Sequence, residues 1–277
     1  MKKFGIMFLT LMFVFGLCGA ALAGDTLAEA KKKGVLVAGV KDSTPGFGYI
    51  DEQTREIVGY DVDFCRAIAK KLGVKLELKS VTSATRMPQL IAGNIDIIAA
   101  TMTKNAERAK QIDFSYTYFK TVQKFITKKG TVKKLADLDG KKIGTAKGST
   151  SEQNAKKSLP AATVLSFDDY PQAFLALQQG KVFAITTDES ILANILHKAP
   201  NKKVYEIPNI IVGDEPYGLG MRKGDTNFVN FVNKTILEME KNGEAKKIFD
   251  KWFGPKGKAF PMKREFKITS EKLSWEQ

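Results

Sequence analysis

Cysteine and histidine are scarce in this chain, whose 277 residues include two cysteines and one histidine. Two cysteines can close at most one disulfide, which excludes a small fold held together by disulfides. A single histidine leaves few positions for the usual transition-metal ligands, so we expect no metal site. We also expect no cofactor. After residue 23 the chain also lacks any run of 18 apolar residues, and it predicts no membrane-spanning helix there.

Apolar and charged residues make up 43% and 27% of the chain, the proportions of an ordinary folded protein. The length predicts two domains or one large one. Lysine and arginine outnumber aspartate and glutamate by 44 to 30, which gives a net charge of +14. On charge alone, acidic substrates, anionic membranes and nucleic acids are all open as partners.

The first 23 residues have the layout of a secretory signal peptide. Lysines at positions 2 and 3 precede the apolar run 4–18, and Ala21-Leu22-Ala23 forms a small-x-small cleavage site. We predict cleavage after Ala23 and export. A membrane anchor would need a longer apolar run, and a lipoprotein would need a small residue in place of Leu17 before Cys18.

Cleavage at that site removes two lysines and one cysteine and leaves 254 residues with a net charge of +12. The remaining cysteine, Cys65, lies in an apolar helical pattern, which predicts an inert buried thiol. Without a second cysteine the mature chain cannot form an internal disulfide.

Short apolar runs alternate with helical patterns from Val35 onward, which indicates βα units around mostly parallel sheets. Extended runs at 121–127 and 216–221 are expected to join two lobes. The residues after 254 are polar and basic, and we expect them either to pack on the surface or to form a loose tail. The expected strands are 35–40, 74–81, 95–101, 143–146, 164–167 and 182–186, and the expected helices are 60–72, 86–92, 151–158, 171–179 and 190–198, with two more amphipathic helices between 228 and 252.

The motifs of common enzyme classes are absent from the sequence. The segment 140–150 is rich in Gly, Lys, Ser and Thr, but Lys147 precedes Gly148, the wrong order for a phosphate-binding loop. The single histidine, His197, ends a helical pattern, where a cation is ordinary, and no nucleophile elbow accompanies it. Lysines occur as scattered pairs rather than in a patch with aromatic residues, so we expect no nucleic acid partner.

Six segments together carry a family signature: Val40–Tyr49, Gly59–Leu72, Thr101–Arg108, Asp113–Tyr118, Gly148–Glu152 and Thr187–Asp188. In this order they resemble the amino-acid-binding family of bacterial periplasmic solute-binding proteins. The resemblance implies an α/β, two-lobed periplasmic-binding-protein fold of type II, with two hinge strands and a ligand cleft between the lobes. Lobe 1 would comprise residues 24–125 and 216–277, and lobe 2 residues 126–215.

The same resemblance implies a function without catalysis. One amino acid would bind in the cleft, the lobes would close on it, and the complex would be delivered to the membrane permease of an ABC importer. We expect the protein to act as a monomer.

The resemblance also implies which residues hold the ligand's backbone groups. Arg108 matches the arginine that binds the α-carboxylate through two parallel N–H donors, and Asp188 matches the acid that receives the α-ammonium. On the residues alone, Arg108 also fits an exposed helix, and Asp188 a helix cap. The residues that match further hydroxyl or backbone contacts are Thr101 and Thr103 at a strand end, and Ser149 and Thr150 at a helix start, where Thr150 also fits an N-cap.

Side-chain specificity is implied by two more cations. Lys41 and Arg86, with Ser83 beside Arg86, match positions that hold cations in glutamate/aspartate binders. Together with Arg108 they exceed what one α-carboxylate needs, and a second ligand carboxylate would satisfy the surplus. The expected ligand is therefore L-glutamate or L-aspartate.

Two positions depart from that pattern. A close glutamate/aspartate binder has arginine where this chain has Lys41, and histidine where it has Tyr170, although a tyrosine hydroxyl can still donate. Phe47 is expected to cover the hydrocarbon part of the ligand. These departures leave glutamine as the rival ligand.

An enzymatic interpretation is also open, because the implied fold is similar to that of the enzyme cyclohexadienyl dehydratase. That reaction needs a carboxylic acid in the cleft to protonate a leaving hydroxyl, and Asp188 or Glu189 would have to serve. A receptor sensor module is a further reading, for which the sequence contains no signalling segment.

Overall fold

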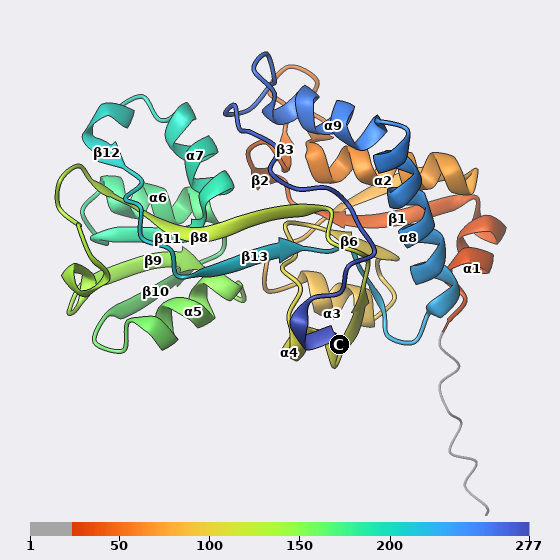
Figure 1. Ribbon diagram of the computed structural model, residues 1–277, viewed down its shortest axis with the longest axis horizontal. Helices are drawn as coiled ribbons and strands as arrows, with labels where there is room; N and C mark the ends of the chain where they lie inside the picture. The colour runs from red at the N-terminus through yellow and green to blue at the C-terminus, as the bar shows by residue number, and fades with distance from the viewer. Residues whose placement is uncertain (1–23, 277) are drawn as a thin grey trace, which may run out of the picture.

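The computed structural model describes residues 24–276, so the expected signal peptide and its cleavage site lie outside the described residues. Two groups of helices and strands lie side by side, and the strands β8 (Phe119–Lys128) and β13 (Gly213–Tyr217) run between them (Figure 1). Each group is built around its own sheet. We call the group that carries both ends of the described chain lobe 1, and the other lobe 2.

Lobe 1 is built on a five-stranded sheet with the order β5-β1-β6-β14-β7. Strand β1, with sequence VLVAGV, pairs in parallel with β5 and β6, while β14 runs antiparallel to β6 and β7. A small second sheet has the order β2-β3-β4. The strands are β1 (Val35–Val40), β2 (Ser43–Thr44), β3 (Gly48–Ile50), β4 (Ile57–Val58), β5 (Lys75–Ser80), β6 (Ile97–Ala99), β7 (Ile112–Phe114) and β14 (Gly220–Arg222); the helices are α1 (Thr26–Lys33), α2 (Tyr60–Leu72), α3 (Arg86–Ile91), α4 (Ala106–Ala109), α8 (Thr226–Lys241), α9 (Glu244–Phe253) and the 3-10 turn Ser274–Glu276.

Lobe 2 is built on a sheet with the order β10-β9-β11-β8-β12, and β13 pairs with β8 outside that path. The strands β9, β10 and β11 are parallel, which is the βα pattern that the sequence predicts. The elements are β9 (Lys142–Ala146), β10 (Thr163–Phe167), β11 (Ala184–Asp188), β12 (Tyr205–Glu206), α5 (Thr150–Ser158), α6 (Tyr170–Gln178), α7 (Glu189–Lys198) and the 3-10 turns Leu135–Leu138 and Lys202–Val204.

Helix α2 shows how the sequence builds the core of lobe 1. Its apolar positions recur at helical spacing and are buried against the sheet and the C-terminal helices. Gly73 ends the helix in left-handed backbone, with φ of 80°, and donates its N–H to the carbonyl of Ala69. Cys65 is a free, buried cysteine, as predicted, and burial raises the pKa of its thiol.

The strands β8 and β13 pair antiparallel, from Phe119 opposite Tyr217 to Gln123 opposite Gly213. The expected lobe boundaries at 125/126 and 215/216 fall inside these two strands, and we keep them as a proposed division. The expected run 216–221 is interrupted, because the N–H of Gly218 bonds to the carbonyl of Met102 instead of continuing toward β14.

Strand β11 begins two residues later than expected. The N–H groups of Lys181 and Val182 bond back to the carbonyl of Ala176 and close the end of α6, so these residues do not join the sheet ladder. As a result Asp188 is the last residue of β11 and lies at the carboxyl end of the strand.

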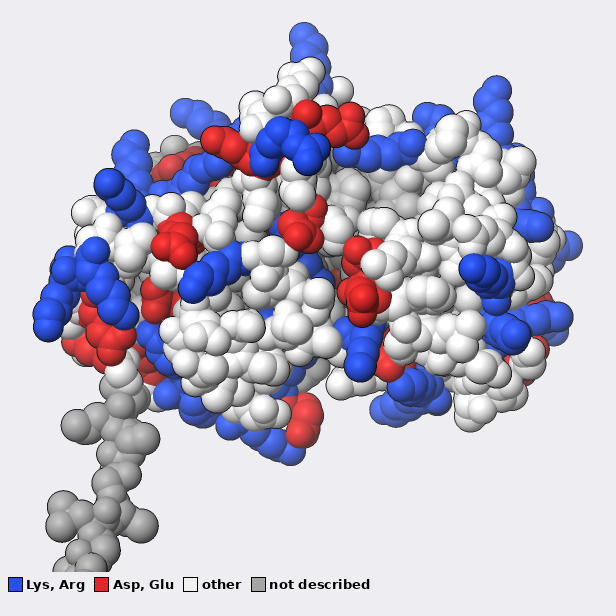
Figure 2. All heavy atoms as spheres, turned by 180° about the vertical axis from the view of Figure 1, so that it is seen from behind, with Lys and Arg blue, Asp and Glu red and all other residues white. Residues whose placement is uncertain are grey.

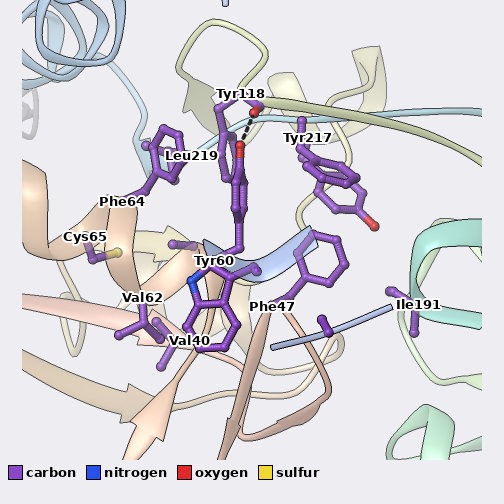
Figure 3. Close-up of a cluster of buried hydrophobic side chains, with 14 of the residues drawn as sticks. Val40, Phe47, Tyr60, Val62, Phe64, Cys65, Tyr118, Ile191, Tyr217 and Leu219 are labelled. Carbon is purple, nitrogen blue, oxygen red and sulfur yellow. Dashed lines mark hydrogen bonds between the residues drawn. The ribbon is translucent and has the colours of Figure 1, made fainter. Parts of the chain in front are cut away.

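A cluster of aromatic rings fills the core of lobe 1 next to the hinge strands (Figure 3). The Phe47 ring packs 4.9 Å from that of Phe119 and 5.7 Å from that of Tyr217, between ring centroids. The Tyr60 hydroxyl donates to the carbonyl of Tyr118 at 2.9 Å, the dashed line in Figure 3. Rings from α2, β8 and β13 therefore join the core of lobe 1 to both hinge strands.

The C-terminal segment 254–276 is not a loose tail, and that alternative is wrong. It runs from α9 across the hinge strands to α4 (Figure 1). Its Phe266 ring packs 5.2 Å from the Phe119 ring, and Glu276 pairs with the buried Lys104 at 3.0 Å. The N–H of Phe260 donates to Asn194 of α7 in lobe 2 at 2.8 Å. The segment packs on both lobes, consistent with the surface-packing alternative.

The surface mixes charges of both signs. Figure 2 shows lysine and arginine side chains spread over the visible face with acidic side chains between them, rather than one basic patch. Among residues 24–276, no helix is both long enough and apolar enough to span a membrane.

Candidate functional site

The three cations singled out by the sequence lie buried in lobe 1. Lys41 follows β1, Arg86 begins α3 and Arg108 lies in α4. Their exposed fractions are 2%, 2% and 6%, so the surface alternative for Arg108 is wrong. Burial, and next the charge of Arg86, lower the pKa of Lys41 to about 7 and that of Arg108 to about 9.

Every hydrogen bond that these three side chains make within the described residues goes to a neutral oxygen. Lys41 Nζ donates to the hydroxyl of Ser83 at 2.8 Å. Arg86 donates to the main-chain carbonyls of residues 100 and 101 at 2.5 and 3.1 Å, and its buried Nε has no partner among residues 24–276. Arg108 donates to the carbonyl of Thr103 at 2.8 Å. None of these hydrogen bonds reaches a carboxylate, and a buried cation without a directly bonded anion is costly, so the site is suited to an anion.

The loop that follows β6 is held in an unusual conformation. Thr101 has a φ of +47°, in the left-handed region that a β-branched residue rarely adopts. Its N–H donates to Asp61 of α2 at 2.9 Å, while its carbonyl accepts from Arg86. Asp61 also accepts from the Tyr118 hydroxyl at 2.7 Å, and burial raises the pKa of Asp61 to about 6. Asp61 thus positions the loop between β6 and α4.

Lobe 2 faces these cations with the N-terminus of α5. Ser149 is the N-cap, because its hydroxyl accepts from the N–H of Glu152 at 3.1 Å, and the N-cap alternative for Thr150 is wrong. Gly148 has a φ of +75°, and a Cβ there would lie 2.7 Å from the Cα of Ala84 in lobe 1. Glycine is therefore required where the two lobes meet.

The lobes are closed on each other at this point. Arg108 donates to the carbonyl of Gly148 across the cleft at 3.4 Å. The hydroxyl oxygens of Thr103 in lobe 1 and Thr150 in lobe 2 lie 3.3 Å apart. The expected residues from both lobes therefore come together, and they are buried where they meet.

Asp188 ends β11 beside this cluster and is 3% exposed. Its carboxylate accepts a hydrogen bond from the Tyr217 hydroxyl. The side chain does not cap α7, so the helix-cap alternative is wrong. Burial, and next the charge of Glu215, raise the pKa of Asp188 well above its usual range.

Glu215 is an acid of the site that sequence reasoning missed. It lies on β13, is fully buried, and accepts hydrogen bonds from the hydroxyls of Thr103 and, at 2.8 Å, Thr150. The expected extended run began at Pro216, three residues after the start of β13, and so left Glu215 out. The signal was the alternation in GDEPY, which places Glu215 and Tyr217 on one buried face of the strand.

Of the remaining predicted residues, Ser83 and Tyr170 lie beside residues of the site, whereas Phe47 lies in the aromatic cluster of lobe 1. Ser83 holds Lys41, and Tyr170 at the start of α6 is buried beside the hydroxyls of Ser149 and Thr187. Phe47 lies in the aromatic cluster behind Tyr217, so its expected cover over the ligand stays a prediction.

Two other sequence candidates stand apart from the site. The Glu189 side chain is 44% exposed and pairs with Lys124 at 2.8 Å, so its proposed role as an acid in the cleft is wrong. His197 lies in the last turn of α7, as expected, with its ring 5.7 Å from that of Phe260. Within residues 24–276, no three His, Cys, Asp or Glu side chains are grouped to hold a metal ion.

Chemically, the site presents buried cations in lobe 1, two buried acids near the hinge, and the N–H groups of a helix start in lobe 2. Cations and helix N–H groups bind anions, and carboxylates accept from ammonium groups. The arrangement therefore suits a small molecule that carries both charges.

Known proteins share this fold and much of this sequence. An ABC transporter glutamine-binding protein, GlnH of Bacillus subtilis, is 40% identical over 82% of this chain and 84% of its own. A glutamate/aspartate import solute-binding protein of Salmonella typhimurium is 35% identical over 88% of this chain and 87% of its own. The structure of an ancestral arginine-binding protein bound to glutamine matches with a TM-score of 0.76 and 42% identity, covering 80% of this chain and 98% of that one.

The α/β architecture with two lobes is the type II periplasmic-binding-protein fold that the sequence predicts. The family model of bacterial extracellular solute-binding proteins, family 3, matches residues 36–255, which contain all the site residues described above. The chain therefore belongs to family 3 of the bacterial extracellular solute-binding proteins.

Proposed function

We propose that this protein captures an acidic amino acid, L-glutamate or L-aspartate, by closing its lobes, and delivers it to the permease of an ABC importer. The observation that carries the proposal is the set of three buried cations, Lys41, Arg86 and Arg108, whose hydrogen bonds within residues 24–276 all go to neutral oxygens. One ligand carboxylate would balance Arg108, and a second would balance the other two.

Each ligand group has a proposed partner. The α-carboxylate pairs with Arg108, the α-ammonium with Asp188, and the side-chain carboxylate with Lys41 and Arg86. Arg86 is also bonded to two main-chain carbonyls, so it holds the β6–α4 loop as well as the ligand. Lys41, held by one hydroxyl, is therefore the cleaner position for testing specificity.

Export to the periplasm, cleavage after Ala23 and action as a monomer are part of the same proposal. The family's description as extracellular, and the names of relatives that act in import, support it.

Glutamine is the second candidate ligand, and two observations favour it. Glu215 adds a second buried acid, which reduces the excess of positive charge in the site. A pKa of about 7 allows Lys41 to be neutral and to donate to an amide oxygen instead of a carboxylate. The similar protein named for glutamine, and the similar arginine-binding protein whose structure has glutamine bound, are consistent with this choice.

An enzymatic role is favoured by one observation, the raised pKa of Asp188, because a protonated carboxyl can protonate a leaving hydroxyl. The relatives described above are named as binding proteins, and we propose a protein without catalysis. Release of phenylpyruvate from prephenate would identify the enzymatic activity.

Calorimetric titration of ligand-stripped mature protein with the twenty amino acids tests the proposal. We expect one site per chain for L-glutamate or L-aspartate, with a micromolar or tighter Kd, which corresponds to about 8 kcal/mol or more. Tight glutamine binding with weak glutamate binding would select the second candidate. No heat from glutamate, aspartate, glutamine or asparagine would overturn the proposal.

Lys41 makes the choice between these ligands depend on pH. Burial and the charge of Arg86 lower its pKa to about 7, while Asp169, Asp42 and Asp61 act in the opposite direction. At pH 8 roughly nine-tenths of the Lys41 amines are then neutral. A ligand carboxylate beside the amine favours the charged form and raises this pKa, so binding takes up a proton.

At pH 8 we therefore expect glutamate to take up about one more proton per site than glutamine does. The affinity for glutamate should fall as the pH rises above 7. Calorimetry in two buffers of different ionisation enthalpy measures the proton uptake, and Lys41→Met is the matched control in which the difference disappears. Equal uptake with both ligands in the unaltered protein would refute this role of Lys41.

A further inference from the structure

Glu215 occupies a place that no other acid of the site has. It lies on the hinge strand β13, at the boundary of the proposed division between the lobes, where β13 pairs with β8. Its Oε2 accepts from the hydroxyl of Thr103 in lobe 1 and, at 2.8 Å, from that of Thr150 in lobe 2. One buried carboxylate oxygen therefore joins the two lobes at the point where they meet.

The chemistry of the hydroxyls restricts what they can do in addition. A threonine hydroxyl has one hydrogen to donate, and an ionised carboxylate only accepts. While Thr103 and Thr150 both donate to Glu215, neither hydroxyl has a hydrogen left for a ligand carboxylate. The donors that remain for the α-carboxylate are the guanidinium of Arg108 and the free N–H groups at the start of α5.

Both threonine hydroxyls donate to the same oxygen of Glu215, the pattern expected for an ionised carboxylate. Burial raises the pKa of Glu215 overall, and the hydroxyls of Thr103 and Thr150 and the charges of Arg108 and Arg86 limit that rise. Its second oxygen, Oε1, lies 3.4 Å from the side-chain nitrogen of Asn154 on α5. All of these contacts to lobe 2 involve α5, the helix that faces the cations.

We propose that Glu215 is a positioning residue that stabilises the closed state. Its carboxylate accepts hydrogen bonds from the hydroxyls of Thr103 and Thr150, which lie on opposite lobes. The inference rests on the proposed amino-acid function, because the state it fastens is the one that holds the ligand. Opening the cleft separates Thr103 from Thr150 and breaks at least one of the two bonds. Glu215 therefore slows ligand release rather than capture.

Stopped-flow fluorescence with L-glutamate, and with L-glutamine as the second probe, measures this directly. For Glu215→Ala we expect the dissociation rate constant to rise about 30- to 100-fold, in keeping with loss of charge-assisted hydrogen bonds, and the association rate constant to stay within about threefold. Glu215→Gln keeps the shape and one acceptor oxygen, so its rise should be about tenfold or less. A damaged fold would instead lower the number of sites found by calorimetry.

Valine substitutions provide the test that does not alter Glu215. Thr103→Val and Thr150→Val should each raise the dissociation rate about tenfold, while the double variant should be little faster than either, because either change alone breaks the link between the lobes. Effects that multiply in the double variant would show that each hydroxyl bonds the ligand independently, and would overturn the proposal. An unchanged dissociation rate in Glu215→Ala would do the same.

The proposed function and the fastening role can fail separately. If the unaltered protein binds neither probe, the proposed ligands are wrong, and small-angle scattering without ligand still tests Glu215. We then expect a larger radius of gyration for Glu215→Ala, and for the double valine variant, than for Glu215→Gln. Equal radii for all of them would overturn the fastening role.

Discussion

Substitution of Arg108 by alanine is expected to weaken the binding of every amino acid ligand by about 100- to 1,000-fold, from the roughly 3 to 4 kcal/mol that removal of one partner of a buried ion pair costs. Arg108 lies between the lobes, bonded to the carbonyls of Thr103 and Gly148. In the proposed complex it is the cation of the α-carboxylate, which all amino acids share. The loss should therefore not depend on the ligand side chain.

Arg108→Lys is the matched control for this experiment. It keeps the positive charge but replaces the planar fork of two donors with a single ammonium. We expect an intermediate loss, again equal for glutamate and glutamine by calorimetry. Binding of either ligand to Arg108→Ala within tenfold of the unaltered protein would contradict the assignment.

Asp188→Asn is expected to have the second largest effect, a loss of about 100-fold for every ligand with an α-ammonium, because a charged partner is replaced by a neutral one. The amide keeps the shape and one acceptor oxygen, so the result reports the missing charge. Tyr217→Phe removes the hydroxyl that donates to Asp188 but leaves the carboxylate, and should cost less than tenfold.

A ligand analogue separates this role from damage to the fold. L-2-hydroxyglutarate has a hydroxyl in place of the α-ammonium, so Asp188→Asn should weaken its binding by less than about threefold, within the range of ordinary neutral hydrogen bonds. An equal 100-fold loss for the analogue and for glutamate would contradict the assignment of Asp188 to the ammonium.

The helices and strands that the sequence predicted well are those whose pattern is local. Helix α2 has one apolar face and a glycine at its end, and its bounds, Tyr60–Leu72, are confirmed. The start of β11 was misplaced, because Lys181 and Val182 bond to the preceding helix, a contact that a hydropathy pattern does not contain. Local periodicity predicts that a helix or strand is present better than it predicts the residue at which that element begins or ends.

The site was predictable as far as each residue carried a family motif. Lys41, Arg86 and Arg108 are brought together as expected, although they come from three separate elements. Glu215 was missed because its role depends on the pairing of β13 with β8, which places it between the two lobes. The balance of cations and acids in a cleft is a property of the tertiary fold, and the sequence alone counted one acid too few.

The insertion of β14 into the sheet of lobe 1 has a consequence for the order in which the protein can form. Gly220–Arg222 lie between β6 and β7, whereas every strand of the lobe 2 sheet lies between residues 119 and 217. As the chain is made from its N-terminus to its C-terminus, lobe 2 can complete its sheet first. The sheet of lobe 1 needs β14, which comes after the last strand of lobe 2 in the sequence. Long-range pairing of this kind is slow. The lobe that carries all three cations is therefore the last to be finished, and ligand binding cannot begin until nearly the whole chain is available.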